Sequence, residues 1–289
     1  MSIEQGSLFI IATPIGNLGD ITIRAVECLE EVDLIAAEDT RRTRKLLSHL
    51  GIRKKIISCN EHNELRKTDQ ILGFLKEGRS AALVSDAGTP GLSDPGARLV
   101  TRVRREGLCI IPVPGPSAVA AALSVSGFPC RSFYFAGFLP QKSSERIKRL
   151  QRLALMEDVL VFFEAPHRLI KCLKDILSVL GDRRLFLARE MTKRHETYLY
   201  STVSRLIGNL EGQKIQGEIT IVLEGGSGLE EKAFDAGLLE EILECLTGSR
   251  FLSVKQASRT LSELTGISRK DIYRLAIKTG KVRREKGEK

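Results

Sequence analysis

The first half of the chain alternates short apolar runs with amphipathic segments, and this alternation limits the folds it can adopt. Five apolar runs have the length of strands, at residues 8–12, 34–37, 55–58, 81–85 and 108–113. Between them, residues 22–31, 40–50 and 65–77 repeat apolar side chains at helical spacing, and Gly51 and Gly78 follow the last two. Continuous apolar strands joined through helices predict an α/β fold with a parallel sheet covered on both faces.

The second half repeats this arrangement less regularly. Strands are expected at residues 133–136, 159–163, 185–188, 197–201 and 218–223, and helices at 143–156 and 167–180. Residues 137–142 separate a strand from a basic helix, and residues 225–228 read Gly-Gly-Ser-Gly, the composition of a flexible linker. The sequence therefore predicts two α/β domains, at residues 1–137 and 138–228, and a separate unit at 229–289.

The last unit is predicted to be helical and basic. Helices are expected at residues 234–246, 254–265 and 269–278, with Gly266 as a stop and Ser268 as a cap, which is typical of a helix-turn-helix. The chain has a net charge of +9, and residues 250–289 hold twelve Lys and Arg against four acids. Charge concentrated in this way is typical of polyanion binding, and a solubilising basic tail is the alternative.

Composition narrows the class of protein. With 42% hydrophobic and 28% charged residues the chain resembles a soluble globular protein. No apolar run approaches the ~20 residues of a membrane span, and the first residues lack the pattern of a signal peptide, so a cytoplasmic location is expected. The six cysteines form no CxxC pair and the four histidines no i, i+4 pair. Reduced cysteines and no metal site are expected.

Three loops follow strands of the first predicted sheet, at residues 13–20, 85–96 and 112–118. Ligands of open parallel sheets bind at the carboxyl ends of the strands. The first loop is Gly-rich but matches neither the dinucleotide nor the P-loop pattern. Any one of these loops could be an ordinary turn. Three of them at the same edge of a sheet predict a ligand cleft.

Eight short motifs occur along the chain, at residues 12–22, 37–41, 85–90, 114–118, 137–140, 164–169, 188–193 and 217–219. In sequence and in order they resemble the tetrapyrrole methylase superfamily, and within it the branch that methylates ribosomal RNA. The resemblance extends to the C-terminal helices. Met191 stands where leucine is expected, and that exchange conserves volume.

The resemblance implies two αβα domains with S-adenosylmethionine bound in the cleft between them. It also implies methylation of the 2′-hydroxyl of a cytidine in the decoding region of 16S rRNA, within the 30S subunit, by a homodimer. The cofactor residues carried over in this way are Pro14, Asp86, Ala87, Gly88, Thr89, Pro90, Ser117, Ala118, Phe163, Ala188 and Gly217.

Methyl transfer to a ribose hydroxyl needs alignment, exclusion of water and help in removing a proton, but no metal. Asp86 is expected to face the positive charge of the cofactor. The candidates for a catalytic role are Glu164, Arg189, Glu190 and Lys193, with His167 nearby. Each has a structural alternative, such as an ion pair between Arg189 and Glu190 or a helix cap at His167, and the sequence does not select among them.

RNA binding requires cations placed to meet phosphates. Arg41, Arg42, Arg44 and Lys45 cluster after a strand end, and Lys142, Arg146, Lys148, Arg149 and Arg152 follow the first linker. Both sets could instead be solvated helix faces. The low aromatic content, 11 Phe, 4 Tyr and no Trp, argues against binding mainly by base stacking. Two other functions stay open: a methyltransferase of the same fold acting on a tetrapyrrole or a protein residue, and a ligand-sensing DNA-binding regulator.

Overall fold

The computed structural model describes residues 6–226, 236–248, 252–265 and 267–286. The chain forms two compact units, one of residues 1–154 and 158–225 and the other of residues 155–157 and 226–289. The first unit contains two five-stranded sheets, and the second contains the C-terminal helices. Among the described residues, no helix has both the length and the apolar character needed to cross a membrane.

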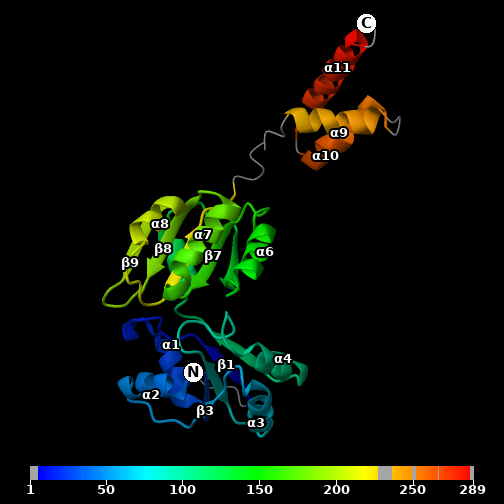
Figure 1. Cartoon of the computed structure of the whole chain (residues 1–289). Coiled ribbons are helices and arrows are strands. Elements are labelled where there is room, and N and C mark those ends of the chain that lie inside the picture. The colour runs from blue at the N-terminus through cyan, green and yellow to red at the C-terminus, as the bar shows by residue number, and fades with distance from the viewer. Residues whose placement is uncertain (1–5, 227–235, 249–251, 266, 287–289) are drawn as a thin grey trace. The chain divides into compact units, whose positions relative to one another are not determined.

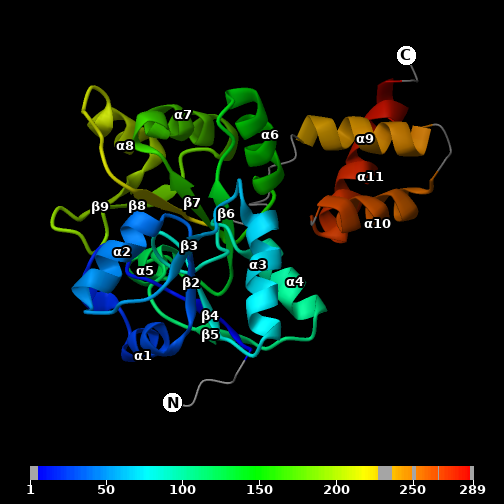
Figure 2. The same ribbon diagram turned by 90° about the horizontal axis from the view of Figure 1, so that it is seen from below.

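The first sheet is parallel throughout, as predicted, with the strand order β3-β2-β4-β1-β5. Helices α1 and α2 pack on one face, and α3 and α4 pack on the other (Figures 1 and 2). The strands are β1 (Leu8–Ile11), β2 (Leu34–Ala37), β3 (Ile56–Ser58), β4 (Ala81–Val84) and β5 (Ile110–Val113), and the helices are α1 (Ile23–Glu31), α2 (Thr40–His49), α3 (Glu64–Lys76) and α4 (Ala97–Arg105).

Local signals set the ends of these helices. The side chains of Thr22 and Asp39 accept hydrogen bonds from the first backbone N–H groups of α1 and α2. Gly51 and Gly78, just beyond the ends of α2 and α3, have φ angles of +74° and +79°. Glycine adopts such angles without a steric cost, so both helices end near the predicted residues.

The second sheet is mixed, with the order β6-β7-β10-β8-β9, in which β6 and β7 are parallel and the other neighbours antiparallel. Helices α6, α7 and α8 pack side by side (Figure 1), and α5 packs on the sheet through a separate core that holds no residue of those three helices. The strands are β6 (Phe133–Phe138), β7 (Val159–Glu164), β8 (Arg184–Arg189), β9 (Thr197–Thr202) and β10 (Ile219–Leu223), and the helices are α5 (Ala118–Ser126), α6 (Ser143–Leu153), α7 (Leu169–Leu180) and α8 (Val203–Leu210).

The chain passes from the first sheet to the second earlier than residue 137. The boundary predicted there falls inside β6, which pairs with β7 along its length. Even α5, which precedes β6, packs through Val119 and Ala122 against strands of the second sheet. An apolar helix can bury its surface on either of two sheets, so its sequence does not show which one it joins.

The C-terminal unit is helical, as predicted. Helices α9 (Ala236–Gly248), α10 (Val254–Thr265) and α11 (Arg269–Lys286) pack around Leu243, Ala257, Leu261 and Ile272. Its described cations Lys255, Arg259, Arg269, Lys270 and Arg274 are exposed. The side chains of the basic residues from Lys278 onward lie outside the described residues, as does the predicted stop at Gly266.

Candidate active site

The three predicted loops are joined to one another by hydrogen bonds. Thr13 and Gly88 exchange two backbone hydrogen bonds of 2.9 Å, which connect the loops after β1 and β4. The Thr89 hydroxyl donates to the Pro116 carbonyl at 3.4 Å and so connects the loops after β4 and β5. Because parallel strands end at the same edge of the sheet, the loops form one continuous wall.

This wall and the facing edge of the second sheet enclose a cleft of about 410 Å³, within the size range of small-molecule sites. Eight of the eleven predicted cofactor residues line it: Asp86, Ala87, Gly88, Thr89, Ser117, Ala118, Phe163 and Gly217. Pro14, Pro90 and Ala188 are not part of the lining. Ala188 belongs instead to the core beneath α5.

The cleft has two chemically different sides. Phe138 and Phe163, whose ring centroids are 5.7 Å apart, form an apolar side with Val119 and Ile219. The other side carries carboxylates from the loops after β2 and β4, namely Glu38, Asp86 and Asp94, and Glu164 and Glu218 beside the apolar side also belong to the lining. Such a site suits a ligand that has a flat apolar part and a positive charge.

The acidic side is held by hydrogen bonds between neighbouring loops. The Asp86 N–H donates to Glu38 Oε2 at 3.3 Å, and Asp86 Oδ1 accepts from the Asp39 N–H at 3.0 Å. Asp86 Oδ2 lies 3.5 Å from the Arg42 guanidinium. Burial, followed by the charges of Asp94 and Asp86, raises the pKa of Glu38. Burial and the charge of Asp86 likewise raise the pKa of Asp94.

Glu38 and Asp94 were not among the residues predicted from sequence. Glu38 follows directly on β2, at the carboxyl edge where ligands of such sheets bind, so the rule used for the other loops also applies to it. The cleft lining further includes Ile15, Arg42, Leu92, Glu218 and Thr220. Of these, Arg42 was predicted, as an RNA contact.

Of the four catalytic candidates, Glu164 lines the cleft, but its carboxylate is fully engaged. Its side chain is 0% exposed, and Oε1 lies 2.8 Å from the Arg168 guanidinium. The Ala165 N–H donates to the same oxygen at 2.7 Å. Arg168 also donates to the Leu139 carbonyl at 2.7 Å. In the structure, Glu164 thus anchors the turn that follows β7.

Glu190 and Lys193 lie beside the cleft and bind each other. Lys193 Nζ donates to Glu190 Oε1 at 2.8 Å and to Glu218 Oε2 at 3.0 Å, and Glu218 belongs to the cleft lining. The hydrogen bond from Lys193 lowers the pKa of Glu190. Glu190 and Thr192 have φ angles of +55° and +64°, a strained conformation for residues other than glycine.

Arg189 and His167 lie elsewhere. Arg189 donates to the Thr197 hydroxyl at 3.1 Å and lines a separate hollow beside Tyr198 and Tyr200. His167 is exposed in the short turn between β7 and α7.

The loop at residues 190–193 also contacts the first sheet's loop at Gly16. A Cβ at Gly16 would lie 2.8 Å from the Met191 carbonyl, 2.6 Å from Thr192 Oγ1 and 2.5 Å from Lys193 Cγ. Asn17 N–H donates to the same hydroxyl at 3.0 Å. Because Gly16 has no side chain, the loop after β1 can contact the loop at residues 190–193, and the two sides of the cleft meet there.

We expect Gly16→Ala to lower the free energy of unfolding by about 1–3 kcal/mol, as overpacking does, and to weaken cofactor binding because Ile15 must move. Urea unfolding and equilibrium binding measure the two effects. Gly73→Ala is the matched control, because nothing lies within 4 Å of its Cβ position in α3. Equal stability and equal cofactor affinity in the two variants would contradict the close contact between Gly16 and residues 190–193.

The predicted RNA-contacting cations lie along α2. Arg41 is 83% exposed and pairs with Asp39, Arg42 reaches the cleft, and Arg44 and Lys45 are exposed. On α6, the expectation for Arg146 is wrong: its side chain is 4% exposed and pairs with Asp175 at 2.6 Å. It also donates to two backbone carbonyls of the preceding loop, so it stabilises that loop.

The sequence is similar to known methyltransferases. The model of a family described as tetrapyrrole (corrin/porphyrin) methylases matches residues 7–207. A Neisseria meningitidis protein named ribosomal RNA small subunit methyltransferase I is 44% identical over 96% of this chain and 94% of its own length. A Thermotoga maritima protein of the same name is 52% identical over 76% of this chain and 99% of its own length.

Solved structures share the fold at low sequence identity. A cobalt precorrin-4 methyltransferase superposes with a TM-score of 0.56 and 18% identity, covering 78% of this chain and 98% of the other. A uroporphyrin-III C-methyltransferase of Thermus thermophilus gives a TM-score of 0.54 and 19% identity, covering 78% and 94%. These likenesses confirm the predicted fold.

Proposed function

Because the chain belongs to the tetrapyrrole (corrin/porphyrin) methylase family, we propose that it transfers a methyl group from S-adenosylmethionine to small-subunit ribosomal RNA. The observation that carries the choice of acceptor is the identity of 44–52% with proteins named ribosomal RNA small subunit methyltransferase I. The acceptor atom in this proposal is the 2′-hydroxyl of a cytidine in the decoding region.

The chemistry of the cleft fits the cofactor. The aromatic side at Phe138 and Phe163 suits a purine, and the carboxylate of Asp86 suits the positive end of the molecule. When bound, S-adenosylmethionine supplies an activated methyl group. The loops after β1, β4 and β5 then orient the reacting groups and exclude water, which is the main task in an in-line displacement.

The proton of the ribose hydroxyl requires an acceptor, and we propose Glu38 for this role. Its carboxylate lines the cleft and, among the residues that the structure describes, accepts one hydrogen bond, from the Asp86 N–H. Glu164 and Glu190, by contrast, are each bound to a cation and a backbone N–H. A carboxylate with a raised pKa is also a stronger base.

The C-terminal unit is proposed to add RNA contacts. The Thermotoga relative is matched over 99% of its length by 76% of this chain, so about a quarter of the chain has no counterpart there. The cleft lies wholly before residue 226, and the basic unit is therefore an accessory to it. A homodimer acting on the 30S subunit in the cytoplasm completes the proposal.

The test is methyl transfer from labelled S-adenosylmethionine to 30S subunits that lack their own methylation, followed by nucleoside analysis. We expect labelled 2′-O-methylcytidine. Label in another nucleoside would change the proposed acceptor. Binding of the cofactor without any labelling of RNA would favour the other methyltransferase hypothesis, in which the acceptor is a tetrapyrrole or a protein residue.

A further inference from the structure

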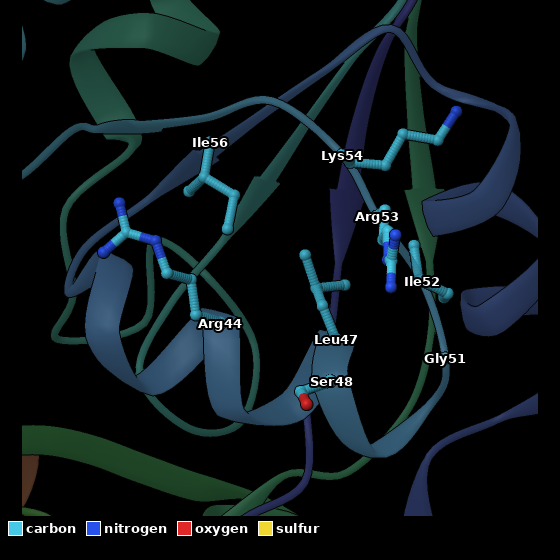
Figure 3. Close-up of a pocket in the computed structure, with 8 residues that line it drawn as sticks. All are labelled: Arg44, Leu47, Ser48, Gly51, Ile52, Arg53, Lys54 and Ile56. Atoms are coloured by element: carbon cyan, nitrogen blue, oxygen red, sulfur yellow. The ribbon is translucent and has the colours of Figure 1, made fainter.

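A basic hollow lies on the first sheet's edge, outside the cleft, and Figure 3 shows its lining. Arg44 projects from α2, and Arg53 and Lys54 come from the segment that leads into β3. Leu47 lies between Arg44 and Arg53 (Figure 3). The hollow has a volume of about 530 Å³, and the full lining is Arg44, Leu47, Ser48, Gly51, Ile52, Arg53, Lys54 and Ile56.

The charge of this hollow is uncompensated. Its lining contains three cations and no carboxylate. Within the part of the chain that the structure describes, none of the three cations forms an ion pair, whereas Arg41 and Arg42 on the same helix pair with Asp39 and Asp86. Arg44 and Arg53 are exposed, and Lys54 is half-buried. Concave surfaces with unpaired cations attract phosphate groups.

Helix α2 connects the hollow to the cleft. Arg42, in its first turn, lines the cleft, while Arg44, Leu47 and Ser48 line the hollow. At about 1.5 Å of rise per residue, Arg42 and Ser48 are roughly 9 Å apart along the helix axis. An RNA strand with its ribose in the cleft could therefore bring a phosphate into the hollow within a few nucleotides.

We propose that this hollow, which we name the Arg53 hollow, binds the phosphate backbone of the substrate RNA beside the nucleotide that is methylated. The inference rests on the proposed function and deepens it, since it identifies where the strand leaves the cleft. Phosphate contacts of this kind position the strand without reading its sequence. Ser48 adds a hydroxyl that can donate to the same phosphate.

The test compares the full chain with its Arg53→Gln/Lys54→Gln variant in binding to unmethylated 30S subunits across a series of salt concentrations. Loss of two phosphate contacts is expected to weaken binding about tenfold and to lower the slope of log affinity against log salt by about 1.4. KM for subunits should rise with kcat and cofactor affinity unchanged.

The matched control is Arg104→Gln/Arg205→Gln, which removes two exposed cations of the same unit that line neither the cleft nor the hollow. An equal loss in this control, or unchanged binding and slope in the first variant, would overturn the proposal. Binding is measured without methyl transfer, so the two proposals fail separately. If the wild type methylates RNA but the variant binds subunits as the wild type does, only the proposal for the Arg53 hollow is contradicted. If the wild type transfers no methyl group to RNA, the proposed function is contradicted.

Discussion

Replacing Glu38 by glutamine is expected to lower kcat for methyl transfer by about 100-fold or more, which is the usual contribution of a positioned general base. Glutamine keeps the size and the acceptor oxygen that meets the Asp86 N–H, so the loop should keep its shape. Cofactor affinity should change little. A loss of cofactor affinity with unchanged kcat would instead assign Glu38 to cofactor binding.

The pH profile provides a second, independent readout for Glu38. The residue must be deprotonated to accept a proton, and burial raises its pKa, so kcat should rise with pH until that raised pKa is passed. The charges facing Glu38 are Asp86, Asp94 and Arg42, and none is altered in the variant. This rising limb should be absent from the Glu38→Gln profile. Its persistence would show that another group titrates.

Asp39→Asn is the matched control for Glu38→Gln. Asp39 is the next residue, but it caps α2 and pairs with Arg41, which lowers its pKa to about 2. Asparagine is an equally good N-cap. Removing this carboxylate should therefore leave kcat within about threefold of the wild type. A fall as large as that of Glu38→Gln would indicate a general effect of charge near the cleft.

Replacing Glu164 by glutamine is expected to lower the free energy of unfolding by about 3–5 kcal/mol. The substitution leaves the Arg168 guanidinium, whose side chain is only 15% exposed, without its carboxylate. Urea unfolding measures the change, with an expected shift of the midpoint at an unchanged slope. Unaltered stability together with lost turnover would return Glu164 to the catalytic candidates.

Two further variants show whether the loss of stability comes from the burial of the ion pair or from the loss of the ion pair alone. Glu164→Gln/Arg168→Met removes both charges and should recover part of the stability, because the unpaired buried cation is gone. Glu211→Gln breaks a pair with Lys174 whose side chains are 60% and 55% exposed. That loss should stay below about 1 kcal/mol.

The identity and order of the secondary-structure elements could be predicted from sequence because they depend on local patterns. Each of the ten strands lies within two residues of its prediction, since apolar runs bounded by turns are a local property. Helices α4, α5 and α8 were not assigned, and α8 has only eight residues. The three loops of the cleft were also predictable, because parallel strands place their carboxyl ends together.

The roles of individual polar residues were less predictable. Arg146 and Arg149 lie on one basic helix, yet Arg146 is buried against Asp175 while Arg149 meets the Tyr134 hydroxyl. Glu164 and Glu190 read as equivalent catalytic candidates, yet each is bound by a different cation. A side chain's partner can come from any distance along the chain, so local pattern does not identify it.

The sequence by itself determined the α/β class, the ten strands, the family and the loops that line the cleft. These features could be predicted because periodicity, turn residues and motifs depend only on residues that are close together in the chain. The tertiary structure alone decided the antiparallel pairing of β10, the packing of α5 on the second sheet and the meeting of Glu38 with Asp86 and Asp94. The physical reason is that these features depend on contacts between segments far apart in the chain, where the burial of one surface depends on the shape of another.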